Sequence, residues 1–133
     1  MRVSELMQKA VRTVGMDAAV GDAIVTLADS HISALPVVDG TGRMVGVVSS
    51  TDILTSEAEA EDSTAREGLF GDTTVRDIMT LHPLTVSPDT EVKEAAQQML
   101  YAEIHRLFVV EGERVVGVIS TSDIMRAVAT GQL

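Results

Sequence analysis

Apolar residues recur along the chain with two periods, one helical and one alternating. Each helical run is followed by two β-branched runs that a glycine-containing turn joins, at 35–38 with 44–49 and at 107–110 with 115–120. A further helix is expected from about Thr51 and over 122–129. The helical runs share one apolar face each, at Val20, Ala23, Ile24, Leu27 and Ala28, and at Val92, Ala95, Ala96, Met99 and Leu100.

Shorter elements precede both runs. The pattern predicts short helices over 3–10 and 75–79, followed by extended pieces over 12–14 and 84–86. Asp17 and the residues 87–90 have side chains suited to capping the long helices that follow. Each half therefore reads helix, strand, helix, strand, strand, helix.

The two halves are copies of one unit. Residues 3–54 placed on 75–125, with one residue near Gly42 unpaired, share 19 identities, among them Val3 with Val75, Met7 with Met79 and Gly46 with Gly117. One such unit is too small to bury its sheet alone, so we expect it to pack on its twin. The boundaries predicted are 1–56 and 75–133, joined by a linker over 57–74.

The linker is rich in Asp and Glu and is expected to be a solvated connector. Leu69 and Phe70 interrupt its polar character and suggest that part of it docks on a folded unit.

Composition narrows the fold and the partners. The chain is 45% hydrophobic with one Tyr, two Phe and no Trp, so we expect an α/β fold with aliphatic cores between helices and sheets.

A net charge of -10 argues against nucleic acid and anionic membranes as partners. The absence of cysteine excludes disulfides and thiolate chemistry. Because the sequence shows no apolar run of the secretory or membrane-spanning type, we expect a cytoplasmic protein.

The strongest repeat is the heptapeptide GVVSSTD at 46–52, which returns as GVISTSD at 117–123. In each copy a strand ends at a serine and a helix begins before an aspartate. Serine and aspartate at such a corner can cap the first helical turn. The corner also points N–H donors outward, which suits an anion or a sugar hydroxyl.

These motifs, with VSELM at 3–7, VRDIMT at 75–80 and HRLFVVEGERVVGVISTSD at 105–123, resemble a tandem pair of cystathionine-β-synthase-type (CBS) domains. The resemblance covers both repeats. It implies two pseudo-twofold-related β-α-β-β-α units packed sheet to sheet, with two clefts that bind adenosine-containing ligands. It also implies homodimers, or fusion to enzymes, channels and transporters.

By the same resemblance, Asp52 and Asp123 are the candidates for binding ribose hydroxyls. A carboxylate accepts from both hydroxyl donors of the diol, through charge-assisted hydrogen bonds. Helix capping alone is the alternative explanation for both residues. The neighbouring hydroxyl residues expected to assist are Ser49, Thr51, Ser120, Thr121 and Ser122.

His105 and Arg106 resemble the phosphate contacts of adenylate-sensing members, whereas Ser33 and Ala34 hold the matching places in repeat one. The alternative is a basic pair on an acidic surface. Spacing leaves open whether they would serve Asp123 or the aspartate of the other repeat. The resemblance places the base near Thr13, Val14, Thr85 and Val86, with Val37 and Val109 as walls, although strand valines usually belong to the core.

No catalytic constellation is present. The three histidines lack the spacing of a helical metal site, and no phosphate-binding loop or nucleophile elbow occurs, so we expect no enzyme activity and no required cofactor. The sequence predicts a regulatory module that binds AMP, ADP or ATP between its repeats and alters a regulated protein or a dimer. The alternatives are S-adenosylmethionine binding, or a ligand-free scaffold that dimerises through 20–28 and 92–100.

Overall fold

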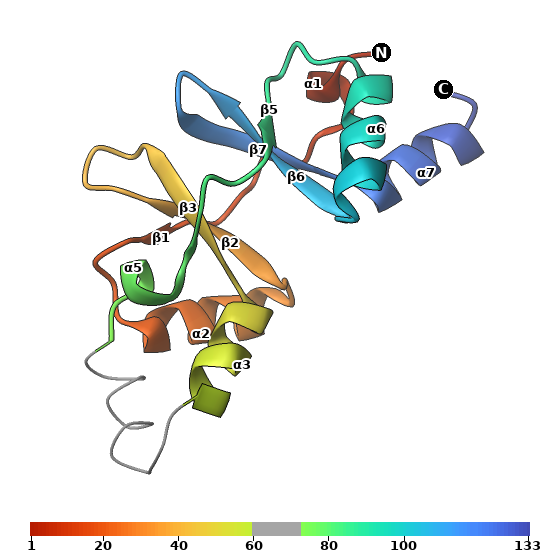
Figure 1. The fold of residues 1–133 in the computed structure, drawn as a ribbon. Helices are drawn as coiled ribbons and strands as arrows, with labels where there is room; N and C mark the ends of the chain where they lie inside the picture. Colours follow the sequence, from red (N-terminus) through yellow and green to blue (C-terminus); the bar gives the residue numbers. More distant parts are fainter. Residues whose placement is uncertain (60–72) are drawn as a thin grey trace. The chain divides into compact units, whose positions relative to one another are not determined.

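A computed structural model describes residues 1–59 and 73–133, in two compact units (Figure 1). Unit 2 spans Arg12–Pro83, and unit 1 joins Met1–Val11 to Leu84–Leu133. The predicted mixed α/β fold and the repeated β-α-β-β-α order are confirmed. The predicted docking of Leu69 and Phe70 lies outside the described residues.

Unit 2 contains a sheet of order β1-β2-β3-β4. β1 (Val14–Gly15) runs parallel to β2 (Ala34–Val38), and β3 (Met44–Ser49) is antiparallel to β2 and to β4 (Thr80–Leu81). Helices α2 (Val20–Ser30) and α3 (Ser50–Glu59) cover one side of the sheet (Figure 1). Their buried side chains form one aliphatic core with the strands, which includes Ala23, Leu27, Leu35, Val37 and Val48.

Unit 1 repeats this arrangement with a three-stranded sheet. β5 (Thr85–Val86) is parallel to β6 (Arg106–Glu111), which is antiparallel to β7 (Arg114–Ser120). Helices α6 (Val92–Ala102) and α7 (Thr121–Ala129) supply the helical layer. The core contains Ala95, Met99, Leu107, Val109 and Ile119.

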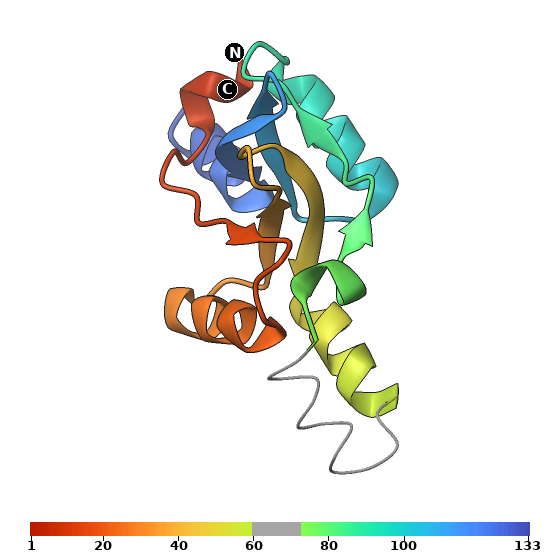
Figure 2. The same ribbon diagram turned by 90° about the vertical axis from the view of Figure 1, so that its left-hand side faces the viewer.

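Each unit is completed by a short helix from elsewhere in the sequence. α1 (Val3–Leu6), although it begins repeat one, contacts β7 and α7, and α5 (Val75–Ile78) contacts α3 (Figure 2). The chain after each short helix crosses a strand glycine. A Cβ on Gly117 would lie 2.6 Å from the Met7 sulfur, and one on Gly46 would lie 2.7 Å from the Thr80 carbonyl oxygen. The glycine of each heptapeptide is therefore needed for this close approach.

The predicted helix over 3–10 was too long. The helix ends at Leu6, and the Gln8 N–H donates to the Val118 carbonyl at 2.8 Å while Val118 N–H returns a bond of 2.9 Å. This bridge to β7 holds the backbone extended. The matching segment of the other repeat forms β4, a strand that the hydrophobic pattern did not predict.

The predicted caps of the long helices were also wrong. The N-cap residues are Ala19 for α2 and Glu91 for α6, and neither makes a side-chain capping bond. Backbone carbonyls from distant segments take over this role, since Val20 N–H donates to Thr73 at 3.0 Å and Val92 N–H donates to Met1 at 2.8 Å.

Candidate functional site

The two strand-to-helix corners have the same internal bonding. In unit 1 the Asp123 Oδ2 atom accepts from the Ser120 N–H at 2.9 Å and from its Oγ at 3.0 Å, and Asp123 N–H donates back to Ser120 Oγ at 3.2 Å. In unit 2 the bonds from Ser49 N–H and Oγ to Asp52 Oδ2 are both 2.9 Å, with a return bond of 3.1 Å. This reciprocal capping box uses one oxygen of each carboxylate and leaves Oδ1 for other contacts.

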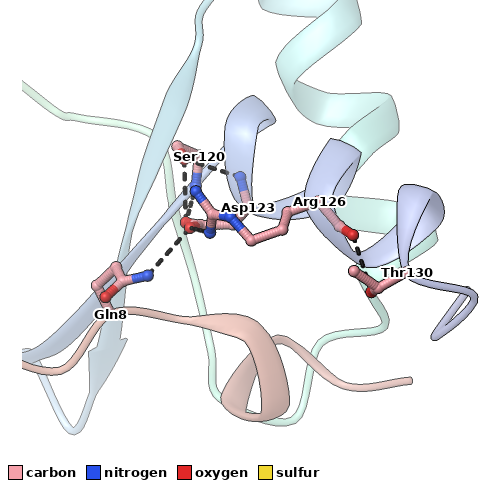
Figure 3. Close-up of polar contacts among 5 residues, drawn as sticks. All are labelled: Gln8, Ser120, Asp123, Arg126 and Thr130. Atoms are coloured by element: carbon pink, nitrogen blue, oxygen red, sulfur yellow. Dashed lines mark hydrogen bonds and ion pairs between the residues drawn. The ribbon is translucent and has the colours of Figure 1, made fainter.

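At the Asp123 corner, Oδ1 is already occupied. The Gln8 side-chain amide donates to it at 3.1 Å, and the Arg126 guanidinium lies 3.4 Å away (Figure 3). Asp123 is only 6% exposed, the one buried charged residue in the described part of the chain. Four donors from three residues therefore enclose this carboxylate and compensate its burial.

The Asp52 corner is more open. Among the described residues, its Oδ1 accepts one further hydrogen bond, from the Thr80 hydroxyl at 3.3 Å. Asp52 is half-buried, and Thr80 is exposed. The repeat places Thr80 where unit 1 has Gln8, and Thr55 where it has Arg126.

The first N–H groups of the two helices are used within each unit. Thr121 N–H donates to the His105 carbonyl at 2.9 Å, and Ser50 N–H donates to the Ser33 carbonyl at 2.9 Å. Together with the capping bonds, these contacts use the N–H groups of Ser50, Asp52, Thr121 and Asp123 within the protein.

The structure separates the side chains of His105 and Arg106. Arg106 pairs with Ser120 across β6 and β7, and cross-strand partners share one face of a sheet. That face is opposite to the one on which Leu107 and Val109 join the core. His105 instead lines a groove between α6 and α7. Arg106 makes no side-chain hydrogen bond or ion pair with any residue that the structure describes, so its guanidinium can receive an anion.

The residues expected near the base are divided between core and surface. Val37 and Val109 are fully buried, and Val14 and Val86 are nearly so. Thr13 is exposed and Thr85 is half-buried. Of the remaining hydroxyl residues near the corners, Thr51 and Ser122 are exposed and Thr121 is half-buried.

Both units have a groove between their two long helices. In unit 1 the groove is about 510 Å³ and is lined mainly by apolar side chains, with Leu100 80% and Met125 70% exposed. In unit 2 it is about 290 Å³, and Leu54 is 64% exposed. Ala96 and Leu100 of the larger groove match Ile24 and Ala28 of the smaller one.

Sequence reasoning missed Gln8, Thr80 and Arg126. Each is close to a corner aspartate only through the fold, or one helical turn after it. The available signal was the duplication, because Gln8 and Thr80 directly follow the matched methionines Met7 and Met79.

A metal-binding cluster and a membrane-spanning helix are both absent from the described ranges 1–59 and 73–133. These ranges contain no group of three or more His, Cys, Asp or Glu side chains placed to bind a metal ion. They also contain no helix with the length and hydropathy required to span a membrane.

Curated proteins of several kinds are similar to this chain. An inosine-5'-monophosphate dehydrogenase of Methanocaldococcus jannaschii is 32% identical over 94% of the chain, which spans 23% of that enzyme. A homoserine O-acetyltransferase of Methanohalobium evestigatum is 28% identical over 95% of the chain and 24% of the enzyme. The chain thus matches a small part of each of these enzymes.

Two of the matching solved structures are covered over nearly their whole length. The CBS-pair protein CBSX2 of Arabidopsis thaliana, in a complex with AMP, has a TM-score of 0.83 and 28% identity, with 99% of this chain and 98% of that one covered. The CBS domain pair of the protein MJ0100, in a complex with 5'-methylthioadenosine and S-adenosyl-L-methionine, has a TM-score of 0.80, 28% identity and coverage of 100% and 98%. The CBS domain family itself matches residues 3–59 and again 75–130, one match to each half of the duplication, and so this chain belongs to the CBS domain family as a tandem pair.

Proposed function

We propose that this chain is a regulatory module that binds an adenosine-containing ligand, with the ribose diol on a corner carboxylate. The observation that carries the proposal is the Oδ1 atom of the half-buried Asp52, which accepts a single long bond, from Thr80, among the described residues. A ribose offers two hydroxyl donors to such an acceptor, and hydrogen bonds to a charged group are about twice as strong as neutral ones.

The two similar CBS pairs support the ligand class. Adenosine is the moiety common to AMP, 5'-methylthioadenosine and S-adenosyl-L-methionine, which occupy those structures. In this chain, Arg106 at the unit 1 corner suits a ligand with a phosphate. At the unit 2 corner Ala34 takes its place opposite Ser49, which favours a ligand without one.

A thermal-shift titration of the full chain tests the proposal. AMP, ADP, ATP, 5'-methylthioadenosine and S-adenosylmethionine are the probes. A ligand at a hundred times its dissociation constant adds about 2.7 kcal/mol to the free energy of unfolding, and we expect such a shift with at least one of them. The absence of a shift with all five at millimolar concentration would refute the proposal.

The matched control removes the diol and keeps the base. For the ligand that binds, its 2'-deoxy counterpart is expected to bind roughly tenfold or more weakly, because one charge-assisted hydrogen bond is lost. Equal affinity of the two would show that neither carboxylate receives the ribose.

We also propose that a second copy of the chain covers the helix grooves, which would make a ligand-sensitive dimer. The grooves expose large apolar side chains, and their bulky and small positions are exchanged between the units: Ile24 and Ala28 in one, Ala96 and Leu100 in the other. The bulky side chain of one groove, such as Leu100, can therefore fill the space beside the small side chain of the other groove, such as Ala28. The linings are mainly apolar, with Glu103 and His105 as the titratable residues of the unit 1 groove and none in the unit 2 groove, which limits charge repulsion where two acidic chains meet.

Sedimentation velocity at micromolar concentration tests this interface. We expect a dimer for the native chain and a monomer for Leu100→Glu, with Val25→Glu, outside both linings, as the control for surface charge. A native chain that sediments as a monomer at roughly 100 μM, where a dimer with a micromolar dissociation constant would form, would contradict this interface.

A further inference from the structure

The two corner carboxylates differ in how much of their hydrogen-bonding capacity the protein itself uses. We infer that Gln8 and Arg126 decide the order in which the corners are filled, so that a ribose diol binds first to Asp52 and reaches Asp123 only after the Gln8 side chain withdraws. This inference rests on the proposed function and adds its regulation.

The argument begins with the acceptor. A carboxylate has two oxygens with about four positions for donors. At Asp123 two positions are filled by Ser120 and two by Gln8 and Arg126, all within 3.4 Å. At Asp52 the bonds from Ser49 are the same, but a single hydroxyl contact of 3.3 Å replaces the other two. A diol adds to Asp52, whereas at Asp123 it must replace bonds that already exist.

Burial sharpens this difference. The Asp123 side chain is 7% exposed while the Arg126 side chain beside it is 66% exposed, and Gln8 is also exposed. The two donors therefore lie between the carboxylate and water. Replacing them without loss requires a ligand that donates equally well, because an unsatisfied buried carboxylate is costly.

Gln8 is able to act as the mobile part. Its backbone is held on β7 by the two bonds with Val118, and only its side-chain amide holds Asp123. The side chain can thus swing out while the main chain stays paired. Figure 3 shows this amide reaching Asp123 from a segment outside β7 and α7.

Arg126 adds a second effect. It contributes a positive charge next to Asp123, on the exposed surface of α7. Arg106, which forms no side-chain bond with any described residue, shares the strand face of Ser120. Once Gln8 has left, this corner offers a diol acceptor with two guanidinium groups around it. The late site is therefore the one suited to a phosphorylated ligand, and the early site at Asp52 accepts the nucleoside part.

Isothermal titration of the full chain with 5'-methylthioadenosine, which has the ribose diol and no phosphate and so compares the two carboxylates alone, tests the order. We expect two binding events of unequal affinity, the tighter one lost in Asp52→Asn and kept in Asp123→Asn. Gln8→Met, which keeps the length of the side chain and removes the donor, is expected to strengthen the weaker event about tenfold, the change that 1.4 kcal/mol produces. Thr80→Val, the matched change in unit 2, is expected to alter either event less than threefold, since its bond is long.

A readout in the ligand-free protein separates this inference from the proposed function. In nitrogen-15 spectra the Gln8 side-chain amide is expected to move in Arg126→Ala and in Asp123→Asn, and to stay in place in Asp52→Asn. If the Gln8 amide signal moves in neither Arg126→Ala nor Asp123→Asn, the inference is overturned, whatever the ligand-binding results. Binding in which Asp123→Asn removes the tighter event, or in which Gln8→Met changes nothing, overturns the order and leaves the proposed function standing. If none of the five adenosine-containing ligands binds the native chain, both the inference and the proposed function are overturned.

Discussion

The Asp52 and Asp123 corners began as copies of one sequence, and they differ in residues outside the copied motif. Both keep the serine-aspartate capping box with bond lengths within about 0.1 Å of each other. What changes is the second oxygen: Thr80 contacts it in unit 2, while Gln8 and Arg126 enclose it in unit 1. The comparison teaches that the shared motif builds the same capping box in both units, and that neighbours supplied by other segments determine which carboxylate is accessible.

The strand glycines give the largest predicted effect. In Gly46→Ala the new methyl group meets the Thr80 backbone oxygen at 2.7 Å, whereas in Gly117→Ala it meets the flexible Met7 sulfur at 2.6 Å and the Gln8 backbone oxygen at the longer distance of 2.9 Å. We expect losses in the free energy of unfolding of about 3 and about 2 kcal/mol, respectively. Urea denaturation measures both. A larger loss for Gly117→Ala would show that Met7 and the Gln8 backbone cannot move aside.

The corner aspartates come next. Asp123→Ala removes a buried carboxylate that accepts hydrogen bonds from four donor groups. Asp52→Ala removes a half-buried carboxylate that accepts from three. We expect the free energy of unfolding to fall by about 2 kcal/mol in the first and about 1 kcal/mol in the second. Equal losses, measured in urea at neutral pH, would remove the energetic basis of the comparison.

A change that should affect both units alike serves as a control. The C-cap residues of α2 and α6 are His31 and Glu103. Their positive φ angles of 53° and 56° favour glycine. His31→Gly and Glu103→Gly are each expected to raise the free energy of unfolding by about 1 kcal/mol. Melting temperatures measure this. A gain in only one of them would mean that the units differ in more than their corners.

The smallest predicted effect concerns the hairpin turns. The Thr41 hydroxyl, together with the N–H groups of Thr41 and Arg43, lowers the pKa of Asp39 from its ordinary value of 3.8. A folded-state pKa below the unfolded one stabilises the fold at pH values above 3.8, and this contribution is lost as pH falls through the folded-state pKa. Asp39→Asn should therefore be less stable than the native chain at pH 7 and converge with it in acid. Stability curves that stay parallel from pH 7 to about pH 2 would contradict this.

The strands and long helices could be predicted because their signals are local. β3 runs over Met44–Ser49 as the β-branched pattern indicated, and the duplication gave the same order twice. The helix starts could not be predicted in this way. Asp17 has the right side chain for a cap, but the N–H of Val20 is bonded to Thr73, a partner that no local pattern reveals.

The residues of the candidate site likewise fall into those that a local motif predicts and those that only the fold brings together. Asp52, Asp123 and their serines follow from a repeated motif whose capping geometry is encoded within four residues. Gln8 reaches Asp123 across 115 positions of sequence, so only the fold brings them together. His105 and Arg106 are adjacent in sequence, and strand alternation sends Arg106 to the Ser120 face while His105 lines the helix groove.

The most direct measurement of the central claim is a carbon-13 titration of the aspartate side-chain carboxyl groups with 5'-methylthioadenosine, which has the diol and no phosphate, in the full chain. The account predicts that the Asp52 signal moves during the first equivalent, and that the Asp123 signal moves afterwards, together with the side-chain amide of Gln8. An Asp123 signal that moves first, or two signals that move together from the start, would contradict it.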